Sequence, residues 1–188
     1  GADKVSINTA AHENPDLIAQ ASRTFGKSTI VVAIEAIRQS DDTYQAFIDN
    51  GRNRADRDAV SWAREGEELG AGEILLTSVD QEGTGTGLDM DLIRKVHSAI
   101  KIPLVVHGGV GRLEDVLGLA AEVKVSGVAI ASMLHYHYLN TNRQVHGFEE
   151  EGNIEFLKSN RTHRKITPMT LAGLKEALSN NQVSCRLD

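Results

Sequence analysis

Five short apolar runs recur along the chain, and each leads through a turn into a helical pattern. Continuous apolar runs of this length are typical of strands buried in a parallel sheet, and the helices between them complete βαβ units. The sequence therefore predicts an α/β fold whose parallel sheet is covered on both faces. The predicted strands are Lys4–Ile7, Thr29–Ile34, Glu73–Val79, Pro103–Val106 and Val128–Ala131.

The segments between these strands are mostly amphipathic. After the first strand, apolar residues from Leu17 to Phe25 recur at helical spacing, and Gly26 stands where a helix commonly ends. A polar stretch after the second strand indicates a small hairpin before a helix that buries Trp62. The polar segment Asn140–Lys165 has little apolar periodicity, so we interpret it as a surface insertion before the last helix.

Length and composition exclude several classes of protein. The 188 residues suffice for one core, so a single domain over 1–188 is expected. The net charge of -6 argues against a nucleic-acid partner, which requires clustered Lys and Arg. No apolar run approaches the ~18 residues of a membrane span, so no membrane partner is expected. Cys185 is the only cysteine, which is consistent with a reducing cytoplasm.

Polar residues and glycines gather where each predicted strand runs into its helix. Gly108 and Gly109 precede a helix start, and Ala131 and Ser132 follow the neighbouring strand. Such positions present backbone N–H groups and a hydroxyl to a phosphate, which predicts an anion site. The alternative is that the glycines only make a tight turn. Asn8 and Thr9, after the first strand, are candidates for a second anion site.

Carboxylates and histidines occupy other strand ends. Glu35 directly follows an apolar run, and such a position suits general acid catalysis. Asp80 and Glu82 follow the third strand, either as substrate-proximal groups or as part of a solvated acidic loop. His107 and the two histidines of "HYH" at 135–137 lack the spacing of a zinc site. We therefore expect a histidine near the substrate, with no metal and no cofactor.

Four motifs in the same order resemble the cyclase subunit of imidazole glycerol phosphate synthase. They are "GADKVSINTAAHENPDLI", "VVAIEAIR", "GAGEILLTSVDQEGT" and "PLVVHGGVG". The resemblance covers Gly1 to about His135 and resumes in "LKEALSNNQVSCRL". It implies a TIM (β/α)8 barrel, of which this chain carries about five βα units, strands 4 to 8. It also implies an ammonia-dependent lyase of histidine biosynthesis that closes an imidazole ring.

The resemblance implies a role for each matching residue. The substrate is a doubly phosphorylated ribonucleotide, and a glutaminase (glutamine amidotransferase) partner supplies the ammonia. Glu35 and Glu82 occupy the catalytic carboxylate positions, while Lys4 and Glu73 match a charged gate that faces the glutaminase. Asp80 and His107 lie near the substrate. The phosphate-binding positions are Asn8, Thr9, Gly83, Gly108, Gly109, Ala131 and Ser132.

The chain also departs from the family pattern. Glu replaces the usual Asp at 35 and 82, Ile37 replaces a common Lys, and His107 replaces a small residue. The family's first three strands have no counterpart here, so we expect a missing N-terminal segment of about 90 residues. Two alternatives stay open. One is a related protein that uses ammonia to amidate a sugar in surface polysaccharide synthesis. The other is a non-catalytic phosphate-binding partner of a glutaminase.

Overall fold

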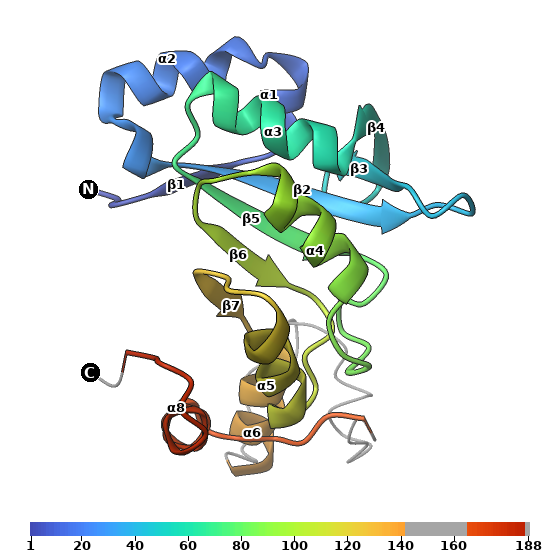
Figure 1. The fold of residues 1–188 in the computed structure, drawn as a ribbon, viewed down its shortest axis with the longest axis vertical. Coiled ribbons are helices and arrows are strands. Elements are labelled where there is room, and N and C mark those ends of the chain that lie inside the picture. Colours follow the sequence, from blue (N-terminus) through green and yellow to red (C-terminus); the bar gives the residue numbers. More distant parts are fainter. Residues whose placement is uncertain (142–164, 187–188) are drawn as a thin grey trace, which may run out of the picture.

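Five parallel strands lie side by side in the computed structural model, which describes residues 1–141 and 165–186 (Figure 1). Each strand pairs with the strand that precedes it in this series, through the pairs β1–β2, β2–β5, β5–β6 and β6–β7. The structure thus confirms all five predicted strands. Their bounds are β1 Val5–Ile7, β2 Ile30–Arg38, β5 Glu73–Ser78, β6 Leu104–His107 and β7 Gly127–Ala129.

The order of these strands distinguishes between two kinds of α/β fold. A doubly wound sheet reverses its strand order at a switch point, whereas a barrel adds each strand beside the last. Here the parallel strands follow one another without reversal. The described residues therefore form an open arc with the connectivity of a (β/α)8 barrel, in agreement with the predicted fold class.

Two antiparallel strands extend the arc beyond β2 and form the expected hairpin. β3 (Tyr44–Ile48) pairs with the second half of β2, and β4 (Asn53–Asp58) pairs with β3. The turn between them places Asp49, Asn50 and Gly51 at φ values of 55°, 57° and 72°. Asn, Asp and Gly tolerate this left-handed region better than other residues, which explains why the chain reverses there.

Helices follow the strands, and several of them begin at a side-chain cap. The carboxylate of Asp58 accepts a hydrogen bond from the Ser61 amide, and Asp89 accepts one from Leu92. These bonds satisfy amide groups that a helix start would leave without a partner. The helices are α1 Thr9–Glu13, α2 Asp16–Phe25, α3 Ala59–Leu69, α4 Met90–Ala99, α5 Leu113–Glu122, α6 Ser132–Thr141 and α8 Leu171–Asn180, with a 3-10 turn, η1, at Lys27–Thr29.

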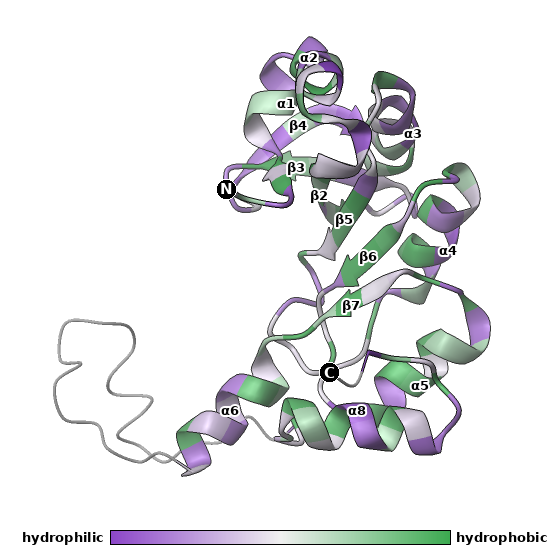
Figure 2. Cartoon of the chain, turned by 90° about the vertical axis from the view of Figure 1, so that its left-hand side faces the viewer, coloured by the Kyte–Doolittle hydropathy of each residue, from purple (hydrophilic) through white to green (hydrophobic). Residues whose placement is uncertain are grey.

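Only one face of the sheet is fully covered by the described residues, contrary to the prediction of two covered faces. Along β5, half-exposed residues alternate with buried ones, and the second half of β2 shows the same alternation. Helices α3, α4 and α5 follow the outer face of the arc (Figure 2). The half-exposed residues, among them Glu35, Thr77 and His107, belong to the opposite, inner face of the arc.

The apolar core consists of two clusters. The larger lies between the sheet and α2, α3 and α4, and it includes Trp62, which is 1% exposed, as the sequence predicted for a packing residue. The smaller cluster joins α5, α6 and α8 around Met133 and Leu174. Each fully buried side chain of this size contributes about 1.5–3 kcal/mol to folding. Most of the predicted insertion, residues 142–164, lies outside the described residues.

His12 lies against the larger cluster, and its environment makes the stability of the fold depend on pH. His12 packs against Trp62 with ring centroids 4.6 Å apart. Burial lowers the pKa of His12, and the Arg57 cation lowers it further. The unfolded chain therefore binds a proton at this residue more readily than the folded chain does.

We predict that the free energy of unfolding falls as the pH drops below about 6.5, where an unfolded histidine becomes protonated. In His12→Phe, which retains an aromatic ring against Trp62 but cannot titrate, this fall should be smaller. Chemical denaturation at pH 7.5 and pH 5.5 measures both proteins. Equal losses of stability in the two proteins would show that His12 does not contribute.

Candidate functional site

A cavity of about 150 Å³ lies at the carboxyl ends of β5, β6 and β7. Its lining includes seven of the residues singled out from the sequence, and it is formed by residues that follow three neighbouring strands. The lining residues are Glu82, Gly83, His107, Gly108, Gly109, Val110, Ala129, Ile130, Ala131 and Ser132. In parallel α/β folds these strand ends are where ligands bind, so the cavity is the candidate functional site.

The glycines of this cavity are required by the backbone itself. Gly108 and Gly109 have φ values of 105° and 102°, in the region that favours glycine. A Cβ on Gly108 would lie 2.5 Å from the carbonyl oxygen of Ser78, and a Cβ on Gly109 would overlap that of Gly87. Close backbone packing thus accounts for both glycines without a ligand, as the tight-turn interpretation proposed. The glycines alone therefore do not indicate an anion site, and the other residues that line the cavity would have to provide it.

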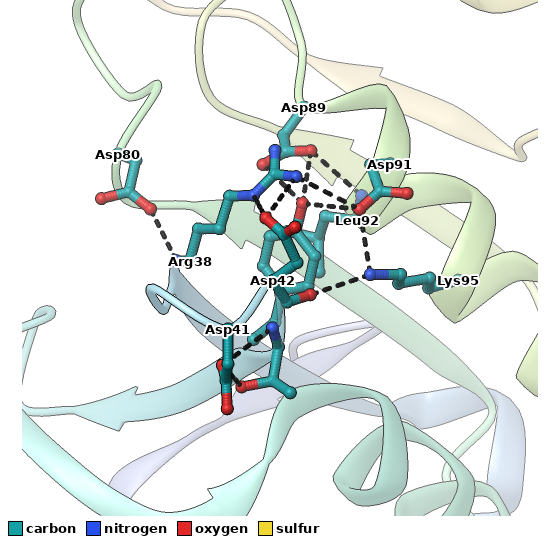
Figure 3. Close-up of polar contacts among 10 residues, drawn as sticks. Arg38, Asp41, Asp42, Asp80, Asp89, Asp91, Leu92 and Lys95 are labelled. Atoms are coloured by element: carbon teal, nitrogen blue, oxygen red, sulfur yellow. Dashed lines mark hydrogen bonds and ion pairs between the residues drawn. The ribbon is translucent and has the colours of Figure 1, made fainter.

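The loop that carries Glu82 and Gly83 is fixed at both ends. At its start, the backbone N–H of Arg38 donates to the Asp80 carboxylate at 2.7 Å (Figure 3). At its end, the Gly87 amide donates to Gly109 O, and the Tyr44 hydroxyl donates to Asp89 at 2.9 Å. These contacts join the loop to the end of β2, to the hairpin and to the turn after β6.

Tyr44 is a residue of this region that the sequence analysis did not single out. Its side chain is 1% exposed, and its ring contacts the cations of Arg38 and Lys95 at 5.7 and 5.1 Å. Burial raises the pKa of Tyr44, as does its hydrogen bond to Asp89. The hydroxyl is therefore a proton donor that stays protonated. A tyrosine in a polar hairpin carried no sequence signal for this role.

Glu35 lies on the inner face near the cavity but does not line it. It is half-buried, and one carboxylate oxygen accepts a hydrogen bond of 2.7 Å from the Gly51 amide at the turn of the hairpin. In the sheet, Glu35 is paired with Thr77, and Thr77 is paired with His107. Two steps between strands separate the Cα atoms of Glu35 and His107 by about 10 Å.

Asn8 and Thr9 lie outside the cavity and contact the hairpin. The Asn8 amide nitrogen donates to Phe47 O at 3.4 Å, and the Thr9 hydroxyl accepts from the Asp49 amide at 3.1 Å. The amide oxygen of Asn8 is buried and makes no hydrogen bond to another described residue. The two residues thus lie apart from the cavity, beside the hairpin, and their role in a second anion site stays a prediction.

Lys4 and Glu73 form an ion pair of 2.7 Å at the opposite, amino-terminal ends of the strands. The side chain of Glu73 is 16% exposed, whereas that of Lys4 is 50% exposed. An ion pair this accessible contributes about 0–1 kcal/mol to stability. The pair therefore marks the far end of the arc and adds little to the stability of the fold.

A second hollow lies away from the predicted site residues. A wider hollow of about 560 Å³ between α1 and the hairpin is lined by Arg54, Arg57, Glu13 and Asp56 among others, and it includes none of the predicted site residues. Within the described ranges, no group of three or more His, Cys, Asp or Glu side chains is arranged to hold a metal ion. The same part of the chain contains no helix with the length and hydropathy needed to cross a membrane.

Comparison with known proteins places the chain in a defined group. Residues 1–140 match the profile of the family described as "Histidine biosynthesis protein". The match includes every predicted site residue, from Lys4 to Ser132. It ends at Asn140, where the polar segment before the last helix begins.

Individual relatives share close to half of the aligned residues. The imidazole glycerol phosphate synthase subunit HisF of Pyrobaculum aerophilum is 46% identical over 152 residues, which cover 81% of this chain and 59% of the relative. The subunit of the same name from Lactococcus lactis subsp. cremoris is 47% identical, and the aligned residues cover 72% of this chain and 53% of the relative. That of Legionella pneumophila is 51% identical, with coverage of 61% and 54%. The chain spans just over half the length of these relatives.

The close backbone contact at Gly109 should make the stability of the fold sensitive to substitution of this residue. We predict that Gly109→Ala lowers the free energy of unfolding by about 3 kcal/mol. The positive φ of this residue is unfavourable for Ala, and the new Cβ would also overlap with Gly87 O. Gly118→Ala is the matched control, since Gly118 lies exposed within α5 with open space around it. The control should gain about 0.5–1 kcal/mol. Denaturant unfolding measures both, and a Gly109→Ala protein as stable as the parent would contradict the packing described.

Proposed function

Because the chain belongs to the histidine biosynthesis protein family, we propose that it acts as the cyclase subunit of imidazole glycerol phosphate synthase. The proposed reaction is an ammonia-dependent ring closure that yields imidazole glycerol phosphate and an aminoimidazole ribonucleotide. The observation that carries the proposal is the cavity at the ends of β5, β6 and β7, where seven predicted site residues meet. The names of the relatives support the same activity.

In this proposal the cavity binds one phosphate of a doubly phosphorylated ribonucleotide. Gly83, Gly109 and Ser132 surround a space that admits a small anion, and backbone N–H groups are suitable donors for it. Asn8 and Thr9 belong to the site of the second phosphate. This assignment supports a substrate that extends across the inner face of the arc, from the cavity toward β1.

Glu35 is the proposed general acid, and Glu82 the second catalytic carboxylate. Glu35 has the position for this role, because it lies on the inner face between the two phosphate sites. The hydrogen bond from Gly51 holds one of its oxygens and leaves the other able to carry a proton. The longer Glu side chain thus has a fixed position, which positioned acid catalysis requires.

We propose that a glutaminase supplies ammonia at the opposite end of the strands, where Lys4 and Glu73 form the gate. The separation of this pair from the cavity supports the proposal. Ammonia that enters at the amino-terminal ends would travel along the inner face to the substrate. The family is described by histidine biosynthesis and the relatives are named as imidazole glycerol phosphate synthase subunits, so neither sugar amidation nor a non-catalytic role is favoured.

The first test of this function concerns Glu35. We predict that protein made from the native gene converts the phosphorylated ribonucleotide in ammonium salts at raised pH, and that Glu35→Gln lowers kcat at least about tenfold. Gln keeps the acceptor for the Gly51 amide but cannot donate a proton to the substrate. Glu68→Gln, an exposed change on α3, is the control and should retain full turnover. Undiminished turnover by Glu35→Gln would exclude the acid role.

The second test concerns the gate. In Lys4→Met the ion pair with Glu73 is lost, and we predict that turnover with glutamine and the glutaminase falls about tenfold, a change of about 1.4 kcal/mol. Turnover with ammonium salts should stay within about twofold, because the catalytic groups at the far end are unchanged. Steady-state kinetics with both nitrogen sources separates the two effects. An equal loss with glutamine and with ammonium would assign Lys4 to the general stability of the barrel instead.

A further inference from the structure

The proposed phosphate cavity has an unusual balance of charge. Glu82 contributes a carboxylate to the lining, and most of the other residues are glycines or apolar. A phosphate monoester brings a further charge of about -1.5 to -2 at neutral pH. Among the described residues that line the cavity, none is Lys or Arg. Of these described lining residues, only His107 has a side chain that can present an N–H donor or a positive charge.

The position of His107 is set by its neighbour on β5. Thr77 and His107 are paired in the sheet, and the Thr77 hydroxyl lies 3.3 Å from Nδ1 of the ring. When this hydroxyl donates to Nδ1, the ring proton resides on Nε2. Nε2 lies on the other side of the ring and makes no hydrogen bond to another described residue. The imidazole is therefore anchored at one nitrogen, with a donor available at the other.

We propose that His107 is a phosphate-binding residue whose Nε2–H donates to a phosphate oxygen in this cavity, with Thr77 as its positioning residue. The proposal rests on the phosphate site of the proposed function and extends it. The donor offsets the repulsion that Glu82 exerts on a dianion in the same cavity.

The test uses inorganic phosphate and the full chain, so that it does not depend on catalysis. In ¹⁵N-labelled protein, phosphate should shift the amide signals of Gly83, Gly109 and Ser132 together with the Nε2 signal of His107. The dissociation constant comes from the titration. In His107→Phe, which keeps an aromatic ring without nitrogens, we expect about tenfold weaker binding, the effect of losing a hydrogen bond to a charged group.

Three further variants make the result specific. His107→Gln supplies an N–H donor near the position of Nε2 and should recover most of the affinity. Thr77→Val removes the anchor at similar volume and should weaken binding by about threefold, a fraction of the charged hydrogen bond. His97→Gln is the matched control, because His97 is exposed on α4 and contacts Lys124 O outside the cavity. It should bind phosphate like the parent protein.

The outcomes separate this inference from the proposed function. If phosphate shifts none of the cavity signals in the parent protein, the phosphate site itself is absent and both proposals fail. If the cavity amides shift but the Nε2 signal of His107 does not, or if His107→Phe binds equally well, only the role of His107 is overturned. The Nε2 signal comes from the unmodified protein, so the test holds even if a variant does not fold.

Discussion

The close approach of two backbone segments at Gly108 and Gly109 is the constraint on which the site depends. Gly108 packs against Ser78 O at the end of β5, and Gly109 O accepts a hydrogen bond from the Gly87 amide. No side chain fits between these segments. The contact brings the end of β6 against the loop that carries Glu82, so His107 and Glu82 become walls of one cavity. Without this contact, the residues that follow the two strands would be separate surface groups.

The hairpin adds a second constraint, because it holds groups from both halves of the inner face. The Gly51 amide in its turn donates a hydrogen bond to Glu35, and the Tyr44 hydroxyl in its first strand donates one to Asp89. Asp89 in turn caps α4 through Leu92. One small antiparallel element therefore positions the proposed acid and also fixes the loop beside the cavity. The hairpin lies at the edge of the strand order, yet its contacts make it part of the structure of the site.

Much of the fold could be predicted from the sequence, since each local signal agreed with the next. The apolar runs marked all five parallel strands, and Gly26 stands at the predicted end of α2. The expectation of two covered faces was wrong for the described residues, because a continuous apolar run cannot distinguish helix cover from a barrel interior. The residues of β5 alternate between half-exposed and buried, but the sequence does not show this alternation. Leu75 on the inner face is as apolar as Leu76 on the outer face.

The sequence could predict which strand ends form the candidate site, but it could not predict the contacts between the residues there. The sequence placed Glu82, His107 and Ser132 at one end of the sheet, and the cavity contains all three. The reason for the glycines was not predictable, because a tight turn and a phosphate site require the same residue type. Thr77 and Tyr44 were also missed, since their roles depend on register and burial.

The parallel direction of the strands explains why the chain has two chemically different ends. Loops follow the carboxyl ends of β5, β6 and β7, so glycines and donors for a ligand collect there. The amino-terminal ends receive short connections, which leave room for the Lys4–Glu73 ion pair at the entrance to the inner face. The inner residues Leu75 and Val105 are paired between these ends and are apolar. A small neutral molecule can follow such a surface, whereas a phosphate would lose its hydration there without replacement. The arrangement therefore separates the proposed entrance for ammonia from the proposed site for the anionic substrate.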